Sequence, residues 1–95
     1  MEQVTVFNSF VNDEDVAIDR DLELVNLEFA MREDMWLTRF VFDVDEETLT
    51  IFIKQDKKLD TYEEDKFYRV IVTKKGTFIG ERFFSKENLT IFTNT

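Results

Sequence analysis

Alternating apolar and polar positions predict β-structure over most of the second half of the chain. The runs 40–44 and 49–53 are rich in β-branched and aromatic side chains, which favour strands. The polar stretch 45–48 between them has the length of a hairpin loop. The same pattern predicts a second hairpin across Gly76 and two outer strands. These further expected strands are residues 4–7, 67–73, 77–84 and 89–93.

The segment 13–37 fits two patterns at once. Asn12 followed by three acids has the chemistry of a helix start, because a side chain caps the first turn and acids favour its positive end. Residues 23–32 alternate in the manner of a half-buried strand. Our interpretation is a short helix near 13–21 followed by a strand near 23–32, and the alternative is one long helix over 13–37. The residues that recur at helical spacing are Ile18, Leu22, Val25, Phe29 and Trp36.

These elements predict an α+β fold in a single domain, residues 1–95. We expect an antiparallel sheet of about five to seven strands, with one helix in the N-terminal third. The polar segment 54–66 is expected to be a long loop or a short solvent-facing helix. The expected core consists of Val4, Val6, Leu27, Phe29, Trp36, Phe40, Phe42, Ile51, Ile53, Val70, Val72, Ile79, Phe83, Leu89 and Ile91.

Composition removes most catalytic chemistry from consideration. The chain has no cysteine, histidine or proline and only two glycines, so thiolate nucleophiles, the commonest general base and Gly-rich phosphate loops are excluded. Acid pairs are too common here to indicate a hydrolase. We therefore expect no enzyme activity and no cofactor. The N-terminus lacks a signal-peptide pattern and no apolar run approaches a membrane span, which predicts a cytoplasmic protein without membrane contact.

Charge is distributed unevenly between the two halves of the sequence. The net charge is −9 overall; residues 1–47 carry fourteen acids against three bases, whereas residues 48–95 carry seven acids against nine bases. The halves therefore have net charges of −11 and +2. Such asymmetry favours an interaction surface in the acidic half. The alternative is that the acids only keep a small protein soluble.

Two groups of acids are candidates for this surface. In a strand, Asp19, Asp21 and Glu23 would share one face at a spacing of ~6.6 Å, from the rise of ~3.3 Å per residue. The first group is Asp13, Glu14, Asp15, Asp19, Asp21 and Glu23, and the second is Glu28, Glu33, Asp34, Asp43, Asp45, Glu46 and Glu47. Residues 43–47 could offer oxygens to Ca²⁺ or Mg²⁺, but they lack the glycine and the spaced glutamate of an EF-hand loop, so we predict no metal site.

In size, acidity and absent catalytic residues, the chain resembles the small acidic DNA-mimic proteins with which phages block host nucleic-acid-binding enzymes. The resemblance extends over residues 13–47 and concerns composition. It implies that carboxylates stand in for DNA phosphates on the surface of the protein. The alternating charge of the second half departs from the most acidic mimics.

We therefore expect a non-enzymatic binding protein that inhibits or modulates a basic, nucleic-acid-binding host protein. The partner's Arg and Lys side chains would pair with the carboxylates. Direct binding of nucleic acid through Lys74, Lys75, Arg82 and Lys86 is disfavoured, because a net charge of −9 repels phosphate. The alternative function is a small structural or assembly subunit, including a homodimer, that pairs through sheet edges such as residues 89–93.

Overall fold

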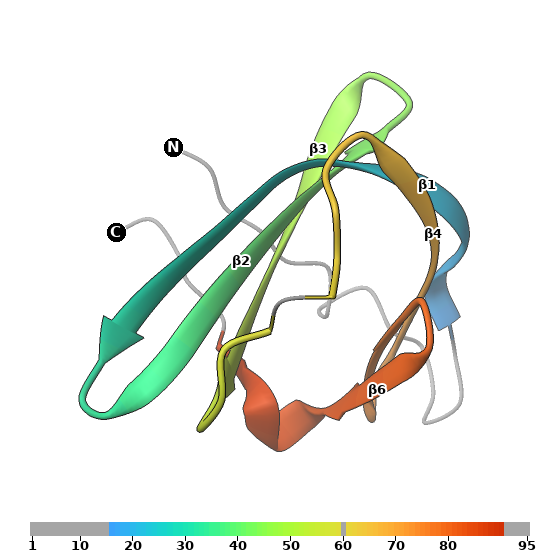
Figure 1. Cartoon of the computed structure of the whole chain (residues 1–95). Helices are drawn as coiled ribbons and strands as arrows, with labels where there is room; N and C mark the ends of the chain where they lie inside the picture. Colours follow the sequence, from blue (N-terminus) through green and yellow to red (C-terminus); the bar gives the residue numbers. More distant parts are fainter. Residues whose placement is uncertain (1–15, 60, 91–95) are drawn as a thin grey trace.

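The structure is a computed structural model that describes residues 16–59 and 61–90 (Figure 1). The described chain forms a single antiparallel sheet of seven strands in the order β6-β5-β4-β1-β2-β3-β7. The strands are β1 (Val16–Arg32), β2 (Met35–Val44), β3 (Glu47–Gln55), β4 (Lys66–Thr73), β5 (Gly76–Ile79), β6 (Arg82–Ser85) and β7 (Leu89–Thr90), with one 3₁₀ turn, η2 (Lys86–Asn88), before β7. The expected strand 4–7, with Val4 and Val6, lies outside the described residues, and so does Ile91.

The antiparallel sheet is confirmed, but the α+β class is wrong because the expected helix is absent from the described chain. Residues 16–21 belong to β1 and pair with β4, so the described part of 13–21 is strand, and the alternative helix over 13–37 is equally excluded. Residues 13–15 lie outside the described chain. The described residues contain no helix with the length and apolarity needed to cross a bilayer.

A β-bulge explains why the sequence of β1 resembles a helix. The pairing of β1 with β2 slips between Leu24 and Asn26, which leaves Val25 as an extra residue. Apolar side chains therefore occupy even positions before the bulge and odd positions after it, as Leu24 and Leu27 show. A change of parity in the middle of a strand produces spacings of three and seven residues, which a helix also produces.

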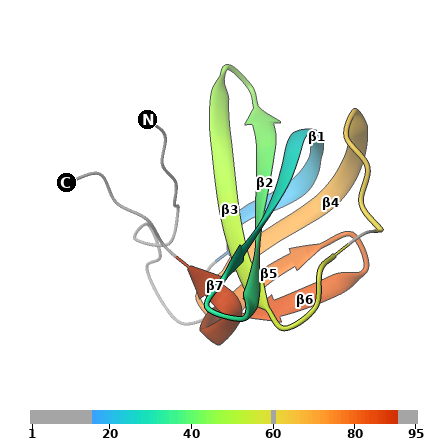
Figure 2. The same cartoon turned by 60° about the vertical axis from the view of Figure 1, so that its left-hand side comes forward.

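Strand β1 joins the β6-β5-β4 part of the sheet to the β2-β3-β7 part. Its first half pairs with β4 as far as Leu24, and its second half pairs with β2 as far as Arg32. The sheet is strongly curved, so that β5 and β6 cross the direction of β2 and β3 (Figure 2). The segment from β6 through η2 to β7 connects the two outermost strands of the order.

The core lies on the concave side of this curved sheet. Seven of the expected core residues are buried, and Leu27, Phe29 and Leu89 pack against them in partly buried positions. Trp36 is also only partly buried. The buried apolar residues are Leu22, Leu24, Phe40, Phe42, Leu49, Ile51, Ile53, Leu59, Tyr62, Val70, Val72, Ile79 and Phe84.

Phe83 was wrongly placed in the core. It pairs with Phe78 on the outer face and is 57% exposed, whereas its neighbour Phe84 pairs with Thr77 on the inner face and is buried. The segment between β3 and β4 is not simply solvent-facing, because it buries Leu59 and Tyr62. The described part of this segment is a loop and contains no helix.

Candidate partner-binding surface

Four of the predicted acids surround an open depression that lies over β1, the end of β2 and the turn between β2 and β3. We call this site the acidic hollow; its volume is about 370 Å³. Its carboxylates come from Asp21 and Glu23 of β1, Asp43 of β2 and Asp45 of the following turn. The complete lining is Arg20, Asp21, Leu22, Glu23, Asp43, Asp45 and Phe67.

Strand register places the central residues of the acidic hollow in one row. Glu23 lies directly opposite Asp43 in β2 and directly opposite Phe67 in β4. Residues directly opposite each other share a face of the sheet, so one apolar and two acidic side chains lie side by side. Asp21 follows on the same face of β1, as the sequence predicted for Asp19, Asp21 and Glu23 in a strand. Like charges directly opposite are destabilising, so the row has an energetic cost.

Ion pairs neutralise some of the predicted acids. Asp19 accepts a hydrogen bond of 2.8 Å from Nε of Arg69. Asp45 lies 3.0 Å from Nη2 of Arg20. Asp21, Glu23 and Asp43 have no ion-pair partner among the residues that the structure describes. These three carboxylates therefore carry the uncompensated charge of the acidic hollow.

The remaining predicted acids are divided between the two ends of the β1–β2–β3 region. Glu33 and Asp34 form the turn between β1 and β2 at the lower left of Figure 1, whereas Glu46 and Glu47 follow Asp45 at the turn drawn at the top. Glu28 lies on β1 between these ends, with one carboxylate oxygen 3.0 Å from Nη2 of Arg39. The acids therefore do not gather in one cluster. Asp13, Glu14 and Asp15 lie outside the described residues.

Several of these acids have positive φ angles, which explains their place in turns. Glu33 and Asp34 have φ values of 52° and 66°, and Asp45 has a φ of 60°. Asp and Asn tolerate this conformation better than most residues because their short polar side chains bond locally. Asp34 and Asp45 therefore have a structural role in the two turns, whatever their charge contributes.

Phe67 belongs to the candidate site, but the sequence pattern did not single it out, because it was expected only as the first residue of the strand 67–73. Its side chain is 67% exposed at the rim of the acidic hollow. The alternation of side chains along β4 indicates the position of Phe67: Val70 and Val72 face the core, so the odd-numbered Phe67 must face outward. Aromatic side chains are enriched in protein–protein interfaces, so the exposed Phe67 is the part of the lining that favours a protein-binding patch.

A second depression, of about 270 Å³, lies beside Tyr62 and Tyr68. The Tyr62 hydroxyl donates a hydrogen bond of 2.7 Å to the Ile79 carbonyl, and the Tyr68 hydroxyl accepts one of 2.8 Å from the Glu63 amide. Burial raises the pKa of Tyr62, and the nearby positive charge of Arg82 opposes this shift. Both hydroxyls make hydrogen bonds that hold the β3–β4 loop in place, so this depression has few polar groups left to bind a ligand.

The described carboxylates are not arranged as a metal site. Among residues 16–59 and 61–90, no three acidic side chains come close enough together to hold a metal ion. The acidic hollow thus presents separated negative charges on a face of the sheet. This arrangement suits several separate cations, such as the Arg and Lys side chains of a partner.

Comparison of the chain with known protein families, with curated proteins and with solved structures finds no match.

Proposed function

We propose that this chain is a non-enzymatic binding protein that inhibits or modulates a basic, nucleic-acid-binding protein. The acidic hollow would be the contact surface and would compete with nucleic acid for the partner's Arg and Lys side chains. Such a role corresponds to that of a phage DNA mimic acting in the host cytoplasm. Carboxylate–guanidinium pairs would supply specificity and fast association.

The observation that carries this proposal is the unpaired state of Asp21, Glu23 and Asp43. Nine basic residues lie in the second half of the chain, yet among the described residues none pairs with these three acids. Glu23 and Asp43 even lie opposite each other, which costs stability. A surface charge arrangement that lowers stability is understandable if it serves binding, because functional sites commonly depart from optimal stability.

Phe67 supports the same surface. Its large exposed side chain adjoins Glu23, so the patch combines an apolar anchor with charges. In interfaces, aromatic anchors dominate the binding energy while surrounding charges steer the approach. Phe67 is thus expected to contribute affinity, and the three carboxylates to contribute association rate and salt dependence.

The test is affinity capture from host lysate with matched charge variants. Glu23→Lys with Asp43→Lys reverses two charges in the acidic hollow, and the two lysines repel as the two acids did. The control is Asp56→Lys with Glu87→Lys, which changes the net charge equally at exposed positions outside the hollow. Folding of both variants is checked by circular dichroism.

We expect the native chain and the control to retain a basic protein that added duplex DNA releases, and the hollow variant to lose it. Binding should also weaken in about 0.5 M salt, where the Debye length falls to about 4 Å. Equal capture by both variants, or capture that neither salt nor DNA disturbs, would show that the acidic hollow is not the contact surface.

A further inference from the structure

Beyond the acidic hollow, the second half of β1 has an open hydrogen-bonding edge. Strand β4 pairs with β1 only as far as Leu24, and β2 covers the opposite side of β1 as far as Arg32. Past Leu24, the side facing away from β2 meets the β3–β4 loop and no other strand among the residues that the structure describes. Asp65 donates a backbone hydrogen bond of 2.8 Å to Leu24, and Glu64 accepts one of 3.0 Å from the Leu27 amide.

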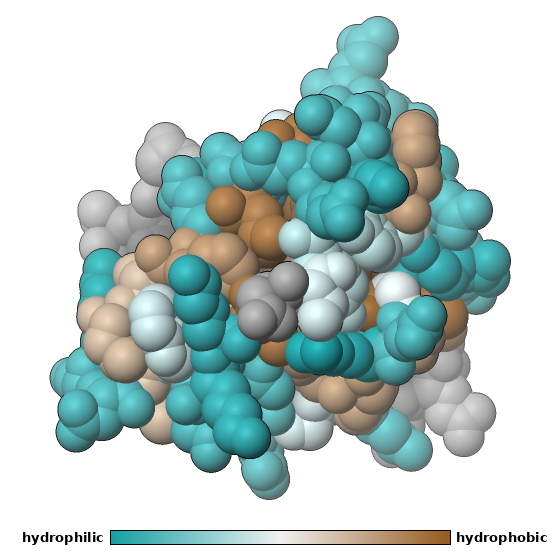
Figure 3. Space-filling view, in the orientation of Figure 1, coloured by the Kyte–Doolittle hydropathy of each residue, from teal (hydrophilic) through white to brown (hydrophobic). Residues whose placement is uncertain are grey.

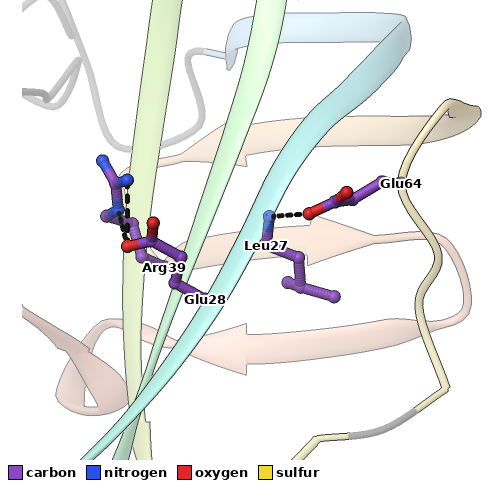
Figure 4. A network of polar contacts seen from close by, with 4 residues as sticks. All are labelled: Leu27, Glu28, Arg39 and Glu64. Atoms are coloured by element: carbon purple, nitrogen blue, oxygen red, sulfur yellow. Dashed lines mark hydrogen bonds and ion pairs between the residues drawn. The ribbon is translucent and has the colours of Figure 1, made fainter.

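The direction of the Leu27 amide identifies which backbone groups remain open. Figure 4 shows β2 and β3 on one side of β1 and Glu64 reaching Leu27 from the other side. Backbone groups of alternate residues in a strand point to the same side. The N–H and C=O groups of Phe29 and Met31 therefore also point away from β2, and among the described residues they have no partner.

This edge has only some of the devices that usually protect an exposed strand: Glu28 and Arg32 are charged, and Nζ of Lys58 in the β3–β4 loop lies 4.8 Å from the centroid of the Phe29 ring. Residues 27–32 contain no proline and no lysine, and the register of β1 with β2 is regular after the bulge. Met31 is 55% exposed. In Figure 3 an apolar area lies at the left, over the end of the β1–β2 hairpin. An edge with open backbone groups and apolar side chains is suited to pairing with another strand.

The sequence of this edge is complementary to itself. If a second copy pairs antiparallel about a two-fold axis at Ala30, Phe29 lies opposite the other copy's Met31. The same register places Glu28 opposite the other copy's Arg32. Phe29 and Met31 of the two copies then exchange four backbone hydrogen bonds, and the charges at both ends of the segment are opposite in sign.

The ion pairs already present leave this register free to form. Arg39 approaches Glu28 through its Oε1 atom, which leaves Oε2 for a second cation. Arg32 has no ion-pair partner in the described chain. Ala30 at the axis is small, and in a non-hydrogen-bonded antiparallel pair the facing Cα atoms come within about 4.5 Å.

We propose that the chain forms a two-fold dimer in which the β1 edges pair antiparallel about Ala30. The occupant of the open edge is thus a second copy of this chain. The paired segment is short, so the dimer is weak and depends on concentration. This inference is independent of the proposed function, because residues 28–32 do not line the acidic hollow.

A cysteine at the axis tests the register directly. The chain has no cysteine, and Cα atoms about 4.5 Å apart lie within the range that a disulfide spans. We expect Ala30→Cys to give a disulfide-linked dimer under mild oxidation, at least about tenfold faster than the control Thr48→Cys at an exposed position. Equal rates for the two variants would overturn the proposed register.

Charge exchange provides a second, non-covalent test by analytical ultracentrifugation. Arg32→Glu replaces two attractive pairs by two repulsive ones and is expected to raise the dimer Kd at least about fivefold. Lys57→Glu, exposed elsewhere, is the control and should leave the Kd unchanged. The double variant Glu28→Arg with Arg32→Glu restores opposite charges and should recover part of the loss. A chain that stays monomeric at all concentrations, or responds equally to Arg32→Glu and Lys57→Glu, contradicts the dimer and leaves the acidic hollow untouched.

Discussion

Tyr62 connects the β3–β4 loop to the core through one buried hydroxyl. Its ring packs edge-on against Phe40 at a centroid distance of 5.2 Å and against Tyr68 at 5.1 Å. The hydroxyl donates to the Ile79 carbonyl at 2.7 Å. Ionisation of Tyr62 would remove this donor and leave a partly buried negative charge, so its protonation state is coupled to folding.

The raised pKa of Tyr62 predicts a loss of stability at alkaline pH. The folded state holds the proton more tightly than the unfolded state, whose pKa is near 10.0. This contribution is therefore complete below about pH 10 and is lost as the pH rises through the folded pKa. Urea unfolding between about pH 8 and 11 should show a decline that is shallower in Tyr62→Phe. Tyr68→Phe keeps Tyr62 and removes only the smaller contribution of Tyr68 to its raised pKa, so this variant should retain most of the decline. An identical decline in Tyr62→Phe and the native chain would contradict the coupling.

At the scale of elements, the β-bulge in β1 and the β3–β4 loop act together. The bulge at Val25 coincides with the point where β4 leaves β1, and the loop supplies Asp65 and Glu64 to the backbone there. Glu64 thus replaces the partner strand at Leu27. An acceptor from a side chain ends the pairing of β1 with β4 without leaving that amide unsatisfied.

Removing this acceptor should weaken the strand locally. Glu64→Ala is expected to lower the free energy of unfolding by about 0.5–1 kcal/mol and to speed hydrogen exchange at the Leu27 amide. The matched control is Glu63→Ala, which removes only an exposed pair with Lys66 and should change stability by less than about 0.5 kcal/mol. Unchanged exchange at Leu27 in Glu64→Ala would mean that the carboxylate does not cap the amide.

Sequence patterns predicted β2, β3 and β4 better than β1, whereas the single strand expected over 77–84 is wrong, because β5 ends at Ile79 and β6 begins at Arg82 after a turn. Hairpins such as 40–53 follow from alternation and turn residues, which are local properties. The helix prediction failed because a bulge mimics helical spacing and because β4 and β2 stabilise β1 from distant parts of the chain. Phe83 and Phe84 are equally apolar neighbours, and only the register of β6 with β5 decides which is buried.

At the scale of the whole molecule, the acidic hollow is expected to destabilise the fold at low ionic strength. Glu23→Gln removes one of two opposed charges and should raise the free energy of unfolding by about 0.2–1 kcal/mol in low salt. The gain should shrink in about 0.5 M salt, because screening already weakens the repulsion. Asp56→Asn, exposed outside the hollow, serves as the control in urea unfolding. A gain that salt does not reduce would show that the repulsion is not its cause.

The candidate site was only partly predictable from the sequence. A strand places Asp19, Asp21 and Glu23 on one face, since that depends only on local geometry, but the interpretation of 13–21 as a helix did not predict that strand. Ion pairing was not predictable, because Arg69 reaches Asp19 from fifty residues away. The separation of Glu33 and Asp34 from the acidic hollow likewise depends on where β1 turns into β2.

The order of the strands has a consequence for the shape of the proposed contact surface. The acidic first half of the sequence supplies β1 and β2, and these lie in the middle of the sheet between β4 and β3 of the second half. The carboxylates of the acidic hollow that lack an ion pair among the described residues, Asp21, Glu23 and Asp43, lie on these two neighbouring strands. At about 4.8 Å per strand, two strands are about 10 Å across, the diameter of one α-helix with its side chains. We expect a partner to present a single basic helix or one extended basic segment to the acidic hollow, rather than a broad basic surface.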